Sequence, residues 1–124
     1  MRPGTLARRR LGQLEAEVLA ELAAADGPVT TADLRSRLSG DPAYTTVNTV
    51  LFRLYDKKLV TRTRVGRHYQ YRLAVDEARL VAGRMHDHLR YASDRSSVLS
   101  RFVQTLSGDE TRALREILDS EDTA

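Results

Sequence analysis

The fold is decided by residues 43–73, which read AYTTVNTVLFRLYDKKLVTRTRVGRHYQYRL. The first half of this stretch has helical periodicity from about residue 43 to residue 57. The inward face of that helix would consist of Val47, Val50, Leu51 and Leu54. The second half alternates with a period of two on both sides of Gly66, which is typical of a β-hairpin with a tight turn.

Two further helices are predicted upstream. Leu11, Leu14, Val18 and Leu22 form one helical stripe, which ends at Asp26-Gly27-Pro28. A short extended piece, 29–30, precedes a second helix that Thr31 is expected to cap and that runs through Leu38. Three helices followed by a β-hairpin form a winged helix-turn-helix, in which the third helix enters the major groove of DNA and the hairpin, or wing, follows the flanking backbone. The predicted class is mostly α with a small β-hairpin.

Helical periodicity returns after residue 75, so three regions are expected. Residues 1–10 form a flexible basic arm, 11–74 a winged-helix domain and 75–124 a helical dimerisation domain. Ser107 and Glu110 have the spacing of a capping box at the start of the last helix. A helical tail of 50 residues cannot bury its apolar stripes alone, which predicts a second copy of the chain as partner. The expected intersubunit residues are Val81, Met85, Leu89, Leu99, Phe102, Val103 and Leu106.

Charge divides the chain more sharply than its net value of +3 suggests. Residues 1–74 hold thirteen Lys/Arg and seven Asp/Glu, whereas 75–124 hold seven and ten. Eighteen of the twenty basic residues are arginine, which pairs with phosphate and guanine edges better than lysine does. The basic front half indicates a polyanion partner, although a solvated basic face would have the same composition.

The third helix is the strongest candidate for a DNA-reading element. Its outer face is not the Glu/Lys-rich surface of an ordinary helix, because it carries hydroxyls, an amide and a guanidinium. The predicted contacts are Tyr44, Thr45, Thr46, Asn48, Thr49 and Arg53. Asn48 is the best candidate for reading an adenine edge. The alternative is that Thr45 caps the helix and the other polar residues are incidental.

The hairpin carries the second group of expected DNA contacts. Arg62 and Arg64 share a strand face, and the turn adds Arg67 and His68. These four side chains would contact phosphate or the minor groove, or else they form an exposed face that deters edge aggregation. The arm supplies Arg8, Arg9 and Arg10 as phosphate contacts. Tyr69 and Tyr71 are expected to cover the core. Phe52 points away from the inward face and either packs under the wing or lies against the DNA sugar edge.

Several classes of function are disfavoured. The chain has no cysteine, which removes disulfides, thiolate metal sites and cysteine nucleophiles. His86 and His88 lie two apart on a helix and make a poor chelate, so neither metal nor cofactor is expected. Catalytic motifs are absent from the sequence, so an enzyme is not expected. Without a signal peptide or an apolar run of membrane-spanning length, a cytoplasmic protein is expected.

The motifs together resemble the BlaI/MecI/CopY family of bacterial repressors over about residues 11–106. The resemblance rests on AYTTV followed by Thr49, on Arg53-Leu54 and Lys57-Lys58-Leu59-Val60, and on the GRxYxY pattern that begins at Gly66. It implies a homodimeric winged-helix repressor that binds a palindromic double-stranded DNA operator. Many relatives have a glycine at the position of Lys58. Either Lys58 adopts a left-handed helix cap, at a cost on the order of 1 kcal/mol, or the helix ends differently here.

The resemblance also implies a means of release. In the β-lactam branch a membrane sensor protease signals, and the repressor is cut in its dimerisation domain before a phenylalanine, which here gives Arg101-Phe102. Arg101 stands where the best-known relatives have asparagine. The copper branch carries a cysteine-rich tail, so copper sensing through thiolates is excluded here. The alternatives left open are a winged-helix protein–protein adaptor and a small-ligand-sensing regulator without a proteolytic switch.

Overall fold

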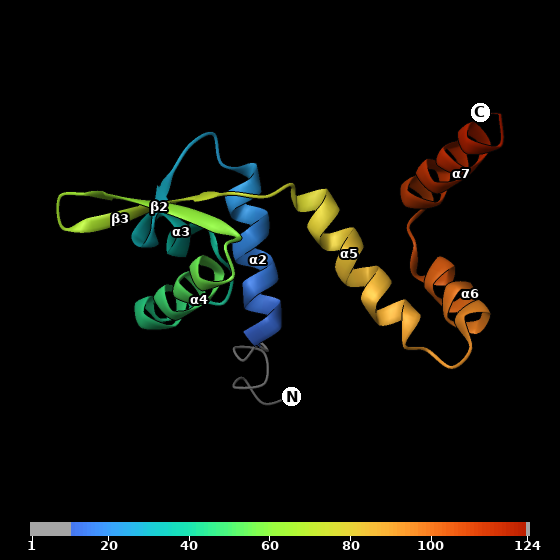
Figure 1. Cartoon of the computed structure of the whole chain (residues 1–124), viewed down its shortest axis with the longest axis horizontal. Coiled ribbons are helices and arrows are strands. Elements are labelled where there is room, and N and C mark those ends of the chain that lie inside the picture. The colour runs from blue at the N-terminus through green and yellow to red at the C-terminus, as the bar shows by residue number, and fades with distance from the viewer. Residues whose placement is uncertain (1–10, 124) are drawn as a thin grey trace. The chain divides into compact units, whose positions relative to one another are not determined.

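The computed structural model describes residues 11–123, and it confirms a mostly helical chain with a small antiparallel sheet (Figure 1). In chain order the elements are α2 (Leu11–Ala24), β1 (Val29–Thr30), α3 (Thr31–Arg37), α4 (Tyr44–Asp56), β2 (Val60–Val65), β3 (His68–Leu73), α5 (Glu77–Arg90), α6 (Arg95–Thr105) and α7 (Gly108–Thr123). The chain divides into two compact units between Val81 and Ala82. We call them the N-terminal unit and the tail unit, and each is described by itself.

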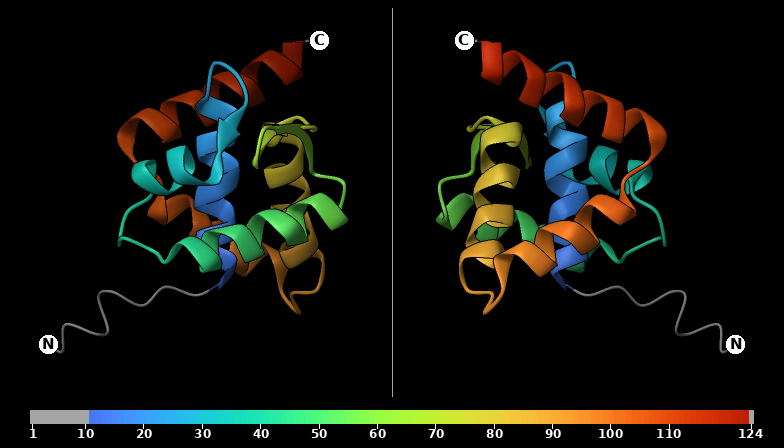
Figure 2. Two further views of the ribbon diagram at one scale, coloured as in Figure 1. Left: turned by 90° about the vertical axis from the view of Figure 1, so that its left-hand side faces the viewer. Right: turned by 90° about the vertical axis from the view of Figure 1, so that its right-hand side faces the viewer.

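The N-terminal unit combines α2, α3 and α4 with a three-stranded antiparallel sheet of order β1-β3-β2 (Figures 1 and 2). The predicted hairpin is confirmed, and its register pairs Val60 with Leu73 and Val65 with His68. Gly66 has a φ of 63°, which glycine adopts without the steric cost of a side chain. The short extended piece forms β1, which pairs with β3 through Val29 and Tyr71.

The hydrophobic core lies entirely within this unit. Its members come from all three helices and from each strand of the sheet: Leu14, Val18, Leu19, Leu22, Val29, Leu34, Leu38, Val47, Val50, Leu51, Leu54, Val60 and Tyr71. The inward face expected for the third helix is therefore confirmed in α4. Because every one of these side chains lies between residues 14 and 71, the N-terminal unit does not depend on the tail for its core.

The N-terminus of α3 corrects one expectation. The cap is Thr30, not Thr31, because the Thr30 hydroxyl accepts a hydrogen bond from the Asp33 amide at 3.1 Å. Thr31 is instead buried as the first residue of the helix, and its hydroxyl donates to Asn48 Oδ1 at 3.1 Å. A buried hydroxyl that finds an acceptor in this way joins α3 to α4.

The two ends of α4 show which residue caps the helix and how the helix ends at Lys58. Its N-cap residue is Ala43, which makes no side-chain cap bond, so Thr45 does not cap the helix. At the other end Lys58 has a φ of 64° and donates its amide to the Tyr55 carbonyl, while Leu59 donates to the Leu54 carbonyl. These two bonds form a Schellman motif, so the left-handed cap considered for Lys58 is present.

The tail unit contains the rest of α5 together with α6 and α7. Asp94 caps α6 by accepting a hydrogen bond from the Ser97 amide at 3.2 Å. The capping box predicted before α7 is confirmed, because the Ser107 hydroxyl accepts from the Glu110 amide and the Glu110 carboxylate accepts from the Ser107 amide. No described side chain between residues 82 and 121 is buried. Between residues 11 and 123, no helix is both long enough and apolar enough to cross a membrane.

Candidate nucleic-acid interface

The outward face of α4 is polar and accessible. Burial of the opposite face against α2, α3 and β2 leaves Tyr44, Thr45, Thr46, Thr49 and Arg53 exposed. The Thr49 hydroxyl donates its proton to the Thr45 carbonyl at 2.9 Å, so toward a ligand the exposed oxygen can act only as an acceptor. Hydroxyls, a phenol and a guanidinium on one exposed helix face suit contacts with phosphates and base edges.

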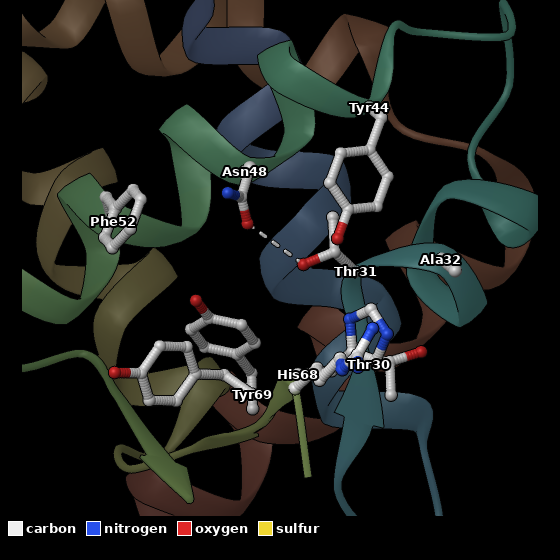
Figure 3. Close-up of a pocket in the computed structure, with 10 residues that line it drawn as sticks. Thr30, Thr31, Ala32, Tyr44, Asn48, Phe52, His68 and Tyr69 are labelled. Carbon is white, nitrogen blue, oxygen red and sulfur yellow. Dashed lines mark hydrogen bonds between the residues drawn. The ribbon is translucent and has the colours of Figure 1, made fainter. Parts of the chain in front are cut away.

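Asn48 lies apart from this group. It is half-buried, and its Oδ1 atom accepts the hydrogen bond from Thr31 (Figure 3). It faces a hollow of about 240 Å³ between α3, α4 and β3, which Tyr44, Phe52 and His68 also line. The Thr31 bond fixes the amide of Asn48, and the carbonyl oxygen retains a second lone pair. Sequence reasoning did not anticipate Thr31 as a partner, because residues 17 apart in the chain show no common periodicity.

The tip of the hairpin presents two arginines and a histidine. Arg64, Arg67 and His68 are all exposed there, as the sequence predicts for a wing. Arg64 Nε donates to the Gly66 carbonyl at 3.1 Å, which holds this side chain along the turn. The exposed guanidiniums of Arg64 and Arg67 are placed to meet an extended polyanion. The expected arm of Arg8, Arg9 and Arg10 lies outside the described residues.

Arg62 differs from the other basic residues of the hairpin. The register places it on the same sheet face as Arg64, as expected, but nearer to α4. Its guanidinium lies among aromatic rings, with Cζ 4.0 Å from the ring centroid of Tyr55, 4.3 Å from that of Tyr69 and 5.4 Å from that of Phe52. Phe52 therefore lies beside the Arg62 guanidinium of the wing, with 45% of its surface exposed.

Tyr71 lies beneath this cluster, directly opposite Arg62 in the strand register. It is almost fully buried, as expected for a core residue, and Tyr69 packs beside it with ring centroids 6.3 Å apart. Burial raises the pKa of the Tyr71 hydroxyl, and the adjacent Arg62 guanidinium acts in the opposite direction. The phenol is therefore neutral at physiological pH and can act as a hydrogen-bond donor.

The tail unit exposes the apolar side chains that the sequence assigned to dimerisation. Met85, Leu89, Leu99 and Phe102 line an open apolar groove of about 480 Å³ between α5 and α6. The groove is completed by His86, His88, Ala92 and Val98. Val81 and Val103 are also exposed, and Leu106 is half-buried. A single chain therefore leaves a continuous set of apolar side chains accessible to solvent.

Arg101, the expected residue before the cut, is exposed beside Phe102 on α6. His86 and His88 are exposed on α5. Within residues 11–123, no three side chains of the His, Cys, Asp or Glu type gather closely enough to hold a metal ion.

Comparison with known proteins identifies the family. The sequence profile of the penicillinase repressor matches residues 11–120. The chain is 41% identical over 114 residues to the "Transcriptional regulator BlaI" of two strains of Mycobacterium tuberculosis, an alignment that covers 88% of this chain and 83% of each relative.

Solved structures support the fold. MepR, a transcription regulator of the Staphylococcus aureus multidrug efflux pump MepA, is 20% identical with a TM-score of 0.50, covering 89% of this chain and 76% of that chain. A mutant of MepR from a multidrug-resistant clinical isolate of the same species gives a TM-score of 0.53 at 20% identity, covering 88% and 75%. Both neighbours are winged-helix regulators. The chain therefore belongs to the penicillinase repressor family and is a BlaI-like transcriptional regulator with a winged-helix fold, not an enzyme.

Proposed function

We propose that the protein is a homodimeric repressor that binds a palindromic operator in double-stranded DNA. The observation that carries this proposal is the combination, in one unit, of an exposed polar face on α4 with exposed arginines at the hairpin tip. In this arrangement α4 reads the major groove, and Arg64, Arg67 and His68 contact the flanking backbone. Thr45, Thr46, Thr49 and Arg53 are the proposed contacts of the helix.

The tail unit supports the proposed dimer. A groove lined by Met85, Leu89, Leu99 and Phe102 is left open in a single chain. A second copy of the tail would cover it with the same apolar side chains, as a two-fold symmetric interface requires. Two recognition helices held in this way would meet half-sites separated by one helical turn of DNA, about 34 Å, or a multiple of it.

Binding to DNA is expected to weaken steeply with salt. Arg53, Arg64 and Arg67 from two copies give about six phosphate contacts, so log K against log salt concentration should have a slope of about −5. Fluorescence anisotropy of a labelled operator across a potassium chloride series measures this slope. Arg67→Ala should make it shallower by about 2, whereas Arg72→Ala, on the opposite sheet face, should leave it unchanged. A wild-type slope shallower than about −2 would contradict electrostatic binding.

Asn48→Ala is expected to reduce operator affinity by about 1–3 kcal/mol and to relax the base preference at one position in each half-site. The reason is that its amide borders the face of α4 proposed to enter the groove. Thr31→Val tests the same contact from the buried side, because it removes the hydrogen bond that fixes the Asn48 amide without touching the DNA-facing surface. Thr31→Val should therefore weaken the base preference at the same position, by less than Asn48→Ala does. An equal loss for Asn48→Ala on operator and random DNA would remove Asn48 from the specificity-determining residues.

We propose that release follows proteolysis in α6 by a membrane sensor protease, in a response to β-lactams or a related stress. Cutting between Arg101 and Phe102 would divide α6 and detach Phe102 and Val103 from the α5 side chains with which they form the proposed dimer surface. Mass spectrometry after co-expression with such a protease should detect fragments ending at residue 101 and beginning at residue 102. An intact chain whose DNA binding is nonetheless lost on induction would favour a ligand-sensing switch instead.

A further inference from the structure

The aromatic cluster around Arg62 joins three elements of the N-terminal unit. Arg62 lies on β2, Phe52 and Tyr55 on α4, and Tyr69 on β3. The distances from Cζ to the ring centroids of Tyr55 and Tyr69, 4.0 and 4.3 Å, are those of a guanidinium stacked closely on both rings. We call this cluster of Arg62, Phe52, Tyr55 and Tyr69 the arginine cage.

The cage shields part of the Arg62 guanidinium from solvent and leaves the residue half-buried. Its Nη1 atom is buried and has no hydrogen-bond partner among the described residues. The planar guanidinium is held by ring faces, whose negative quadrupole attracts a cation, and by a side-chain hydrogen bond with the Tyr71 hydroxyl. A guanidinium in this position is poorly placed to reach DNA phosphate.

Arg64 provides an internal comparison on the same strand face. It is exposed, its Cζ lies 5.9 Å from the Tyr69 ring centroid, and its Nε bonds to the turn carbonyl of Gly66. Arg62 therefore contacts the aromatic side chains of α4, whereas Arg64, on the same sheet face, lies at the surface.

On this basis we propose that Arg62 is a positioning residue that fixes the angle between wing and recognition helix and so contributes to operator specificity. The inference rests on the proposed DNA-binding function. Operator binding requires α4 and the wing to engage the groove and the backbone simultaneously, so it depends on their relative orientation. Random DNA is bound through phosphate contacts, which tolerate a wing that moves.

The test uses the full chain, with a duplex selected as operator and a random duplex, across a salt series. Arg62→Ala should lower operator affinity about tenfold, change random-DNA affinity less than about threefold, and leave the salt slope unchanged. Tyr55→Leu carries no change of charge and should reproduce this pattern. The operator affinity of the double variant should be little lower than that of the weaker single variant, because both substitutions remove the same contact between Arg62 and Tyr55. Arg64→Ala, the control, should weaken both duplexes and make the slope shallower by about 2.

Other outcomes overturn the proposal in distinguishable ways. If Arg62→Ala weakens both duplexes equally with a shallower slope, Arg62 is a phosphate ligand, and the proposed function stands. If only the melting temperature falls, with the ratio of operator to random affinity unchanged, the cage stabilises the fold without affecting specificity.

If Arg62→Ala does not fold, Arg62→Lys replaces it in the same measurements, because lysine keeps the charge but loses the planar stack. An Arg62→Lys variant with the operator affinity of the wild type would contradict the positioning role of the Arg62 stack. If the wild type itself showed no salt-dependent DNA binding, the proposed function would be wrong.

Discussion

A fragment comprising residues 1–74 is expected to fold, to remain monomeric and to bind operator at least about 100-fold more weakly than the full chain. It should fold because every fully buried core side chain lies between residues 14 and 71, and of the half-buried side chains packed against that core it loses Leu80. It should bind weakly because each half-site alone provides few contacts, and joining two half-site binders multiplies the affinity by about 10²–10⁴. All proposed DNA contacts of the described chain are retained in the fragment.

Sedimentation equilibrium of the fragment and of the full chain, with operator affinity measured for both, checks this expectation. Circular dichroism of the fragment provides the control for folding. A fragment that is dimeric, or that binds as tightly as the full chain, would show that the tail is not the dimerisation element. The proposed proteolytic release would then fail with it.

Phe102→Ala is expected to destabilise the dimer by about 3–5 kcal/mol for each substituted side chain, provided that its surroundings become core-like on dimerisation. Phe102 is 39% exposed in the single chain and lines the apolar groove with Leu99 and Met85. Buried aromatic residues at the centre of an interface account for much of its binding energy. A loss of this size raises the dissociation constant of the dimer by more than about 100-fold.

The dissociation constant is measured by sedimentation velocity over a concentration series. Gln104→Ala on the same helix is the matched control, because Gln104 is polar and does not line the groove. Gln104→Ala should leave the dimer intact, and the melting temperature of the N-terminal unit should not change in either variant. A Phe102→Ala chain that dimerises like the wild type would place the interface elsewhere.

The architecture of the N-terminal unit could be predicted because its signals are local. The apolar stripe of α4 and the period of two around Gly66 each depend on residues close in sequence, as does the Ser107–Glu110 capping box of the tail, and the structure contains all three. The helix cap was misplaced by one residue because Thr30 and Thr31 are both capable cap residues. Only the backbone conformation distinguishes them, and that depends on the pairing of β1 with β3.

The candidate site was predicted less completely, because its contacts are long-range. Alternation places Arg62 and Arg64 on one face but does not reveal that only Arg62 meets the aromatic side chains of α4. The spacing of Phe52 and Tyr55, three apart on a helix, was an available signal for an aromatic patch facing the hairpin. The bond between Thr31 and Asn48 had no such signal.

Selection of duplexes from a random-sequence pool by the full chain, at about 150 mM salt, measures both the sequence and the symmetry of the bound site. The expected result is enrichment of an inverted repeat whose half-site centres lie one or two helical turns apart, about 34 or 68 Å. Such a result requires both a DNA-reading α4 and a two-fold symmetric dimer. Enrichment of a single unrepeated site, or of no sequence at all, would show that the protein is not a dimeric reader of a palindromic operator.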